Sequence, residues 1–239
     1  MIRRALLPLA LVAATLAAAA GQAAAKAPYV KHVFIVVLEN ESADTTFGKD
    51  SPAPYLANTL RKKGAFVPNY YATGHLSNDN YLAMVSGQAP NPQTQADCQF
   101  YNDFTPGTPT SGGQYIGQGC VYPPGVETVA NQLKHSGYTW KAYIEDMNSV
   151  APNGQQPNYS FIASDLCHDG HDSPCATRAP GDRIGAIMMS RCIEPGTRTE
   201  KPYDHYSMLH SIESNLGYAG QAGLSPFGRD LFTDPSCGR

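Results

Sequence analysis

The chain has 239 residues, and its 17 Lys and Arg against 20 Asp and Glu give a formal net charge of −3. No stretch gathers the basic residues into the stripe that nucleic-acid binding requires, so a nucleic-acid partner is not expected. The 22 glycines and 19 prolines predict many loops around a modest amount of regular structure.

Residues 1–25 are predicted to be a secretory signal peptide. Arg3 and Arg4 form a charged start, residues 5–20 an apolar stretch, and residues 23–25 a small-residue cleavage site. A retained membrane anchor is the alternative, but the apolar stretch is short and alanine-rich for a membrane span. We therefore expect a secreted or periplasmic protein with no stable membrane anchor after signal cleavage.

Residues 26–239 are expected to form one domain in which strands and helices alternate. Strands are predicted at 33–38, 65–71, 138–144, 159–163 and 184–189, and helices at 54–63, 78–86, 126–136 and 204–216. This alternation predicts an α/β fold with a mostly parallel sheet flanked by helices. The six consecutive apolar residues at 33–38 are typical of a strand that is buried on both faces. Residues 88–123, rich in Gln, Pro, Gly and Thr, are predicted to be a loop.

The six cysteines of an exported chain are expected to form disulfides. The loops that they flank favour the pairs Cys98–Cys120 and Cys167–Cys175. Cys192 and Cys237 remain, and their pairing stays open because six cysteines permit about fifteen connectivities. A zinc site is the alternative, but the spacings lack the close cysteine pair that such sites use.

Polar clusters follow the predicted strands at their carboxyl ends. They are Glu39-Asn40, His75 to Ser77, Glu145-Asp146 and Asp165 to Asp172. In an open parallel sheet these positions gather along the edge where ligands bind. We therefore expect the four clusters to lie close together in a functional site.

The first two clusters suit a reaction that needs a divalent metal and a hydroxyl nucleophile. Glu39 and Asn40 offer oxygen ligands. Ser77 lies at the amino end of a predicted helix, which stabilises a developing alkoxide, and His75 is placed to act on a leaving group or bind a phosphate oxygen. The alternatives are a strand-end turn, an N-cap serine and a loop histidine.

Two further regions carry candidate ligands. His168, Asp169, His171 and Asp172 lie in a loop between two cysteines, where they form either a metal site or a solvated acidic loop. His205 precedes or opens the last predicted helix, and is either a helix-start histidine or a phosphate contact.

Most of the chain after residue 32 falls into stretches that occur in one family and in that family's order. They are VFIVVLENESADTTFG, APYLANTLRKKGAFVPNYYATGHLSNDNYLAMVSG, GCVYPPGVETVANQLKHSGYTWKAYIEDM, SFIASDLCHDGHDSPC, RIGAIMMSRCIEPGT, KPYDHYSMLHSIESNLGYA and SPFGRDLF. The chain resembles the bacterial secreted phosphoesterases, a family of phospholipase C enzymes and acid phosphatases in the alkaline phosphatase-like superfamily.

The resemblance implies a metal-dependent phosphoric ester hydrolase that acts through a phosphoserine on Ser77. It implies that Glu39, Asn40 and Ser77 bind a divalent metal ion, whose identity it leaves open. The substrate would be a phosphomonoester or a phospholipid head group.

Other motif positions follow from the same resemblance. His75, Asn80 and Tyr81 match the family's His-x-Ser-x-x-Asn-Tyr pattern. Asp169, His171 and Asp172 match its Asp-x-His-Asp loop, as possible metal or phosphate contacts, and His205 matches a histidine with a catalytic role.

Two departures from the family pattern are visible. Only NSVAPNGQQPN joins the strand before Glu145 to the next strand, where relatives have several dozen residues. The segment ATRAPGD, with Asp182 as its one acid, replaces a helix and a core strand whose acids complete the family's metal site. The alternative function is therefore a catalytically impaired domain that binds phosphate or anionic lipid without turnover.

Overall fold

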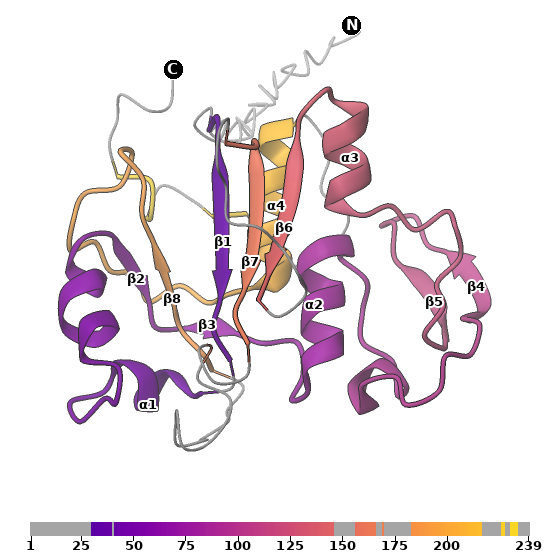
Figure 1. Ribbon diagram of the computed structural model, residues 1–239, viewed down its shortest axis with the longest axis horizontal. Helices are drawn as coiled ribbons and strands as arrows, with labels where there is room; N and C mark the ends of the chain where they lie inside the picture. The colour runs from indigo at the N-terminus through magenta and orange to yellow at the C-terminus, as the bar shows by residue number, and fades with distance from the viewer. Residues whose placement is uncertain are drawn as a thin grey trace, which may run out of the picture.

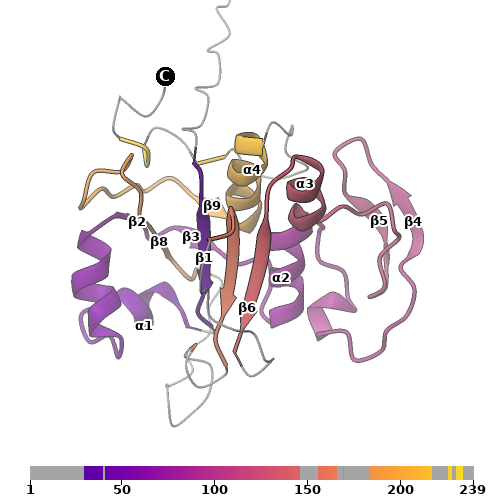
Figure 2. The same ribbon diagram turned by 45° about the horizontal axis from the view of Figure 1, so that its top comes forward.

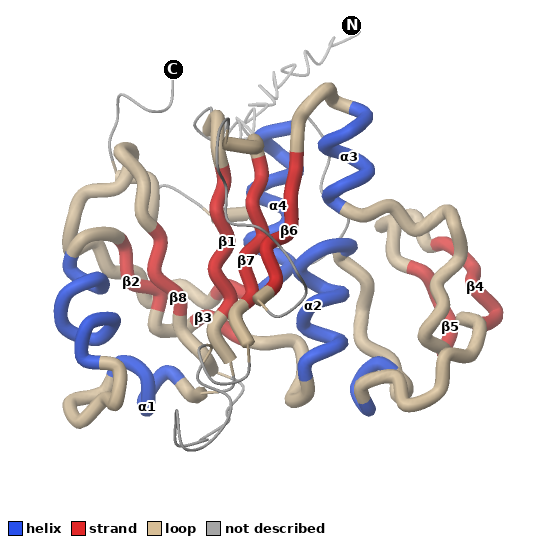
Figure 3. The backbone as a smooth tube through the Cα atoms, viewed as in Figure 1, coloured by secondary structure: helices blue, strands red, loops and turns tan. Residues whose placement is uncertain are grey.

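The structure is a computed structural model, and it describes residues 30–39, 41–145, 156–165, 169, 183–216, 226–227 and 230–233. The strands are β1 (Val33–Val37), β2 (Ala65–Val67), β3 (Tyr70–Tyr71), β4 (Thr105–Pro109), β5 (Tyr115–Gln118), β6 (Trp140–Ile144), β7 (Tyr159–Ala163), β8 (Ala186–Met188) and β9 (Tyr203–Asp204). The α-helices are α1 (Ala43–Phe47), α2 (Ser77–Ser86), α3 (Val129–His135) and α4 (His205–Leu216). Short helical turns are η1 (Tyr55–Thr59), η2 (Leu60–Lys62) and η3 (Thr94–Ala96). Figures 1 and 3 show their arrangement.

A three-stranded parallel sheet in the order β1-β7-β6 is the centre of the fold. Its three strands begin together, because Val33 and Trp140 both pair with Tyr159. Parallel strands need crossover connections, and α2 and α3 lie in the chain between β1 and β6 (Figure 1). The sheet therefore brings the carboxyl ends of three strands to one edge.

Helices α2, α3 and α4 pack on one face of this sheet (Figure 2). The shared core contains Met84, Val129, Leu133, Tyr159, Phe161, Ala163, Leu209 and Ile212, with Val33, Ile35 and Val37 packed against it. The α3 helix begins with a capping box between Thr128 and Asn131, which satisfies its first N–H groups.

The opposite face of β1 is exposed, which corrects the prediction that this strand is buried on both faces. Phe34 is 51% exposed, Val36 59% and Leu38 47%. Successive side chains of a strand point to opposite faces, and among the described residues the core helices cover only the face of Val33, Ile35 and Val37. A continuous apolar run therefore predicts a strand, but it does not show whether one or both faces of that strand are buried.

The predicted mostly parallel sheet is present only as the small sheet of β1, β7 and β6. The described strands outside the central sheet form two-stranded pairs: β2 with β8 and β4 with β5 are antiparallel, and β3 with β9 is parallel. The predicted strand 65–71 is interrupted at Pro68, which has no N–H for a ladder. The fold is mixed α/β with a small parallel sheet and a few helices.

The segment 88–123 was predicted to be a loop, but it contains η3 and the β4–β5 hairpin. The hairpin strands include TPGTP, whose proline and glycine hide any alternation of apolar and polar residues. The predicted disulfide Cys98–Cys120 is present and ties the two ends of this region together. Cys192 is disulfide-bonded as well, whereas the predicted pair Cys167–Cys175 and Cys237 lie outside the described residues.

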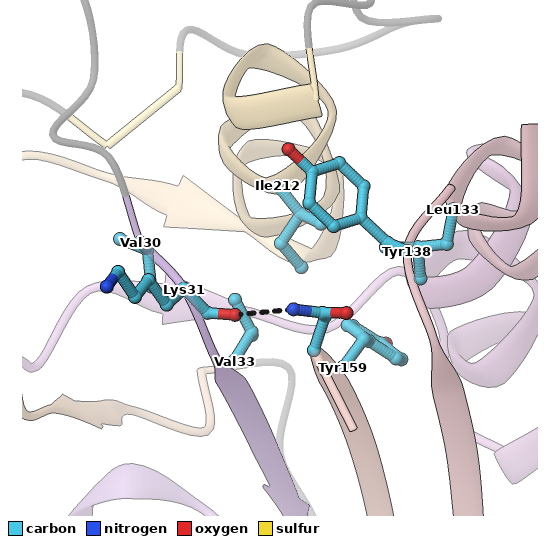
Figure 4. Close-up of a pocket in the computed structure, with 8 residues that line it drawn as sticks. Val30, Lys31, Val33, Leu133, Tyr138, Tyr159 and Ile212 are labelled. Carbon is cyan, nitrogen blue, oxygen red and sulfur yellow. Dashed lines mark hydrogen bonds between the residues drawn. The ribbon is translucent and has the colours of Figure 1, made fainter. Parts of the chain in front are cut away.

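In the part of the chain that the structure describes, no helix is long and apolar enough to cross a membrane. A cavity of about 20 Å³ lies at the amino ends of β1 and β7, beside Val33, Tyr159 and the hydrogen bond from Asn158 to the Lys31 carbonyl (Figure 4). It has room for about one water molecule, so it is no substrate site.

Leu133→Ala should lower the free energy of unfolding by about 2–5 kcal/mol, because its buried side chain, 2% exposed, leaves a cavity in the core. Leu38→Ala, the same change on the exposed face, should cost less than about 1 kcal/mol. Urea denaturation of both variants measures the difference. Equal losses would contradict the one-sided core.

Candidate active site

The carboxyl edge of the central sheet gathers acidic residues from three strands, as expected. Glu39 follows β1, Glu145 follows β6 and Asp165 follows β7. The Asp165 N–H donates to Glu145 Oε2 at 3.1 Å, and the Glu39 N–H donates to the Asp169 carbonyl at 2.9 Å. The loop after β7 therefore contacts the end of β1, while Asn40, Asp146, His171 and Asp172 lie outside the described residues.

Glu39 joins the sheet edge to the first turn of α2. Its Oε2 accepts a hydrogen bond from Ser77 Oγ at 3.1 Å, and its Oε1 accepts one from the Tyr81 hydroxyl at 2.6 Å. Ser77 and Tyr81 are four residues apart and share one face of the helix. The structure thus brings the predicted nucleophile onto the predicted metal-binding carboxylate.

Tyr81 was noted only as a motif match, and its contact shows what it does. Burial, together with the hydrogen bond to the Glu39 carboxylate, raises the pKa of Tyr81 above its ordinary value. The hydroxyl therefore keeps its proton at neutral pH and donates a hydrogen bond to Glu39. This bond fixes the carboxylate so that its other oxygen faces Ser77.

The N-cap alternative for Ser77 is wrong, because Ser77 is the first residue of α2 and Leu76 is the N-cap, with no side-chain cap bond. The Asn78 N–H donates instead to Asp97 Oδ1 at 2.8 Å. Asp97 and Cys98 have positive φ angles of 53° and 51°, next to the Cys98–Cys120 disulfide. No local pattern in the sequence signals this contact across 19 residues.

Asn80 holds the loop that precedes Ser77. Its side-chain amide donates to the carbonyls of Gly74 at 2.9 Å and Leu76 at 2.7 Å, and its Oδ1 accepts from the Thr73 N–H at 2.8 Å. The sequence suggested a metal or phosphate contact for Asn80. In the structure its contacts fix the backbone on both sides of His75.

Asp79 explains why Gly74 is a glycine. Asp79 is fully buried, its Oδ2 has no hydrogen-bond partner among the described residues, and a Cβ at Gly74 would meet its carboxyl group. Burial raises the pKa of Asp79 above its ordinary value, because a charged carboxylate is poorly solvated there. A glycine is required for the loop to pass this buried acid.

The two candidate histidines lie in different environments. His75 is exposed, two residues before Ser77. His205 is 5% exposed at the start of α4, and its Nδ1 lies 3.1 Å from the Tyr70 hydroxyl, with the rings packed edge to face. Burial lowers the pKa of His205 to about 4, so its ring is neutral near pH 7.

Only part of the predicted metal site can be located. The side chains of Glu39 and Ser77 are hydrogen-bonded to each other. Asp169 is buried, and its carbonyl accepts a hydrogen bond from the Glu39 N–H. Within the described ranges, no group of three or more His, Cys, Asp or Glu side chains is arranged to hold a metal ion. The two placed residues supply hard oxygen donors, but too few for a complete cation site.

Comparisons with curated proteins find two distant relatives. The chain is 31% identical over 130 residues to a phosphatidylinositol-3-phosphatase of Mycobacterium tuberculosis, which covers 54% of the chain and 36% of that protein. It is 24% identical over 256 aligned positions to a probable acid phosphatase of Kluyveromyces lactis. This alignment covers 77% of the chain and 58% of that protein.

The chain thus spans between about a third and three-fifths of the length of these relatives. No family model matches the chain, and no solved structure matches it. The two relatives support the resemblance to phosphoesterases at that general level.

The low pKa of His205 predicts a pH-dependent stability. The unfolded chain, with an ordinary pKa of 6.5, binds a proton that the folded chain takes up only near pH 4. His205 therefore leaves the free energy of unfolding unchanged above about pH 6.5 and lowers it by up to about 3 kcal/mol as the pH drops to 4. His205→Gln should remove this component in urea denaturation at a series of pH values.

The exposed His135, 59% exposed, provides the control. His135→Gln should leave the pH profile of the wild type unchanged. An identical profile for His205→Gln and the wild type would show that His205 is not buried in its neutral form.

Proposed function

We propose that this chain is a phosphoric ester hydrolase of the phosphatase type, with Ser77 as its nucleophile. The observation that carries the proposal is the hydrogen bond from Ser77 Oγ to Glu39 Oε2, at the start of α2 and the edge of the parallel sheet. The similarity to two proteins named as phosphatases supports the reaction class. The domain would comprise residues 26–239 and act after export.

In the first step Ser77 Oγ attacks the phosphorus atom of the ester. Its proton passes to Glu39 Oε2, which is already the acceptor of the hydroxyl hydrogen bond. The bond between phosphorus and the leaving oxygen breaks, and that oxygen takes a proton from the solvent-exposed His75. The products of this step are the free alcohol and a phosphoserine at Ser77.

In the second step water attacks the phosphoserine. The neutral His75 accepts the proton of the water, the bond between phosphorus and Ser77 Oγ breaks, and Glu39 returns its proton to Ser77. Inorganic phosphate leaves, and every group regains its starting protonation state. The Tyr81 hydroxyl holds the Glu39 carboxylate in place through both steps.

We assign proton transfer to His75 because His205 is unsuited to it in this geometry. The His205 ring is buried against Tyr70 and stays neutral down to about pH 4, since burial lowers its pKa. Its contact links β3 to the start of α4, so we propose that it supports the fold around the site.

We further propose that activity depends on a divalent metal ion bound at Glu39 and Ser77. Carboxylates of Glu39 and Asp97 lie at the amino end of α2 and repel an anionic phosphate, and a bound cation would supply the missing positive charge. The described donors do not complete such a site. Asn40, Asp169, His171 and Asp172 are the proposed further ligands.

Ser77→Ala should reduce hydrolysis of p-nitrophenyl phosphate by about a thousandfold or more, because the nucleophile is lost. Ser86→Ala, in the last turn of the same helix, is the matched control and should keep full activity, since in the described part of the chain its hydroxyl bonds the Leu82 carbonyl and not Glu39. Assays with phosphatidylinositol phosphate vesicles show whether lipid head groups are also substrates. Full activity of Ser77→Ala would contradict the nucleophile assignment.

Removal of divalent ions with EDTA should abolish activity, and readdition of one of Mg²⁺, Mn²⁺, Ca²⁺ or Zn²⁺ should restore it. Glu39→Gln should weaken binding of that ion by about tenfold or more in calorimetry, because a charged oxygen ligand is lost. Glu127→Gln, a half-exposed acid on the loop before α3, is the control.

Full activity after chelation would contradict the metal dependence. Phosphate binding without turnover in any of these ions would instead support the alternative function, a domain that binds phosphate or anionic lipid but does not cleave esters.

A further inference from the structure

A polar cleft lies away from the Ser77 site, between α1 and β2. Its volume is about 180 Å³, and it is lined by Asp44, Phe47, Arg61, Phe66, Arg183 and Arg198 among others. Neither Glu39 nor Ser77 nor Tyr81 lines it. Three of the chain's arginines therefore converge on one cleft, which the proposed reaction does not use.

Phe66 fixes two of the three arginines. The Cζ atoms of Arg61 and Arg198 lie 5.4 Å and 5.2 Å from the centre of its ring. Arginine stacks on aromatic faces through a cation–π attraction. Phe66 is itself held by Phe47, whose ring centre is 4.8 Å away. The two guanidinium groups are thus partly ordered before any ligand binds.

The arginines retain hydrogen-bond donors that the described chain does not use. Arg61 donates to the Phe47 carbonyl at 3.3 Å, Arg183 to the Pro68 carbonyl at 3.2 Å and to Asp44 at 2.6 Å, and Arg198 to Glu200 at 2.6 Å. A guanidinium group has about five N–H donors. Each of the three groups therefore has N–H donors left for a ligand.

The charge of the lining is positive. Three arginines and the single acid Asp44 give the described lining a net charge of +2, against −3 for the whole chain. The side chains of Asp44 and Glu200 are 85% and 68% exposed, and exposed ion pairs contribute little to stability. A ligand anion can therefore compete with both carboxylates for the guanidinium groups.

We propose that this cleft binds an oxyanion of the phosphate or sulfate class, either free or as the head group of a phosphorylated lipid. Guanidinium groups match the geometry of phosphate oxygens and form paired, charge-assisted hydrogen bonds with them. Fixed arginines on Phe66 lower the entropy cost of binding. The site is independent of Ser77 and binds the anion without cleaving it.

The test is an NMR titration of the full chain with inorganic phosphate at low ionic strength. The backbone amides of Phe47 and Gly48, which line the cleft, should shift and saturate. Arg61→Gln and Arg198→Gln should each weaken this binding by about tenfold, the loss expected for one charge-assisted contact. Arg191→Gln, at an exposed position outside the lining, is the matched control and should not change it.

Ser77→Ala separates this site from the proposed active site. It should abolish hydrolysis and leave the shifts of Phe47 and Gly48 intact, so either proposal can fail alone. Phosphatidylcholine vesicles with and without phosphatidic acid distinguish a lipid head group from free phosphate as the better ligand. Absence of the amide shifts, or equal binding by the wild type, Arg61→Gln and Arg198→Gln, would overturn the proposal.

Discussion

The carboxylate of Glu39, with a hydrogen bond on each oxygen, is the interaction on which the candidate site depends. It joins the end of β1 to the first turn of α2 through Ser77 and Tyr81. Its backbone N–H also donates a hydrogen bond to the Asp169 carbonyl in the loop after β7. One residue therefore sets the spacing between the sheet edge and the helix, and any reaction at Ser77 inherits that spacing.

The chain after β1 contacts acidic groups at one place and basic groups at another. Glu39 and Asp97 meet the amino end of α2, where they orient a hydroxyl and an N–H. Arg61 and Arg183 donate hydrogen bonds to α1, and this helix begins only a few residues after Glu39. The first arrangement suits proton transfer and cation binding, and the second suits an anion. A chain of net negative charge therefore still gathers three arginines around one cleft.

The part of the site that could be predicted follows from one rule of parallel sheets. Because strand ends share an edge, Glu39, Glu145 and Asp165 were expected to lie close together, and the loop after β7 contacts both other strand ends. The contact of Ser77 with Glu39 does not follow from this rule, because β3 pairs with β9 outside the central sheet. Asp97 could not be predicted, since its contact spans two left-handed residues and a disulfide that only the folded chain creates. The same limit applies to the fold: residues 65–71 look like one strand, and the apolar run at β1 conceals an exposed face.

The two histidines show why a motif fixes a position but not a role. His205 and His75 both match the resemblance, and sequence alone treats them alike. A charged imidazole loses its hydration in the interior of the fold. Burial therefore lowers the pKa of His205 to about 4 and keeps its ring neutral near pH 7. His75, two residues from Ser77 on a loop that Asn80 holds in place, is exposed to solvent. Burial of His205 and exposure of His75 are the differences between the two residues, and only the three-dimensional structure supplies that information.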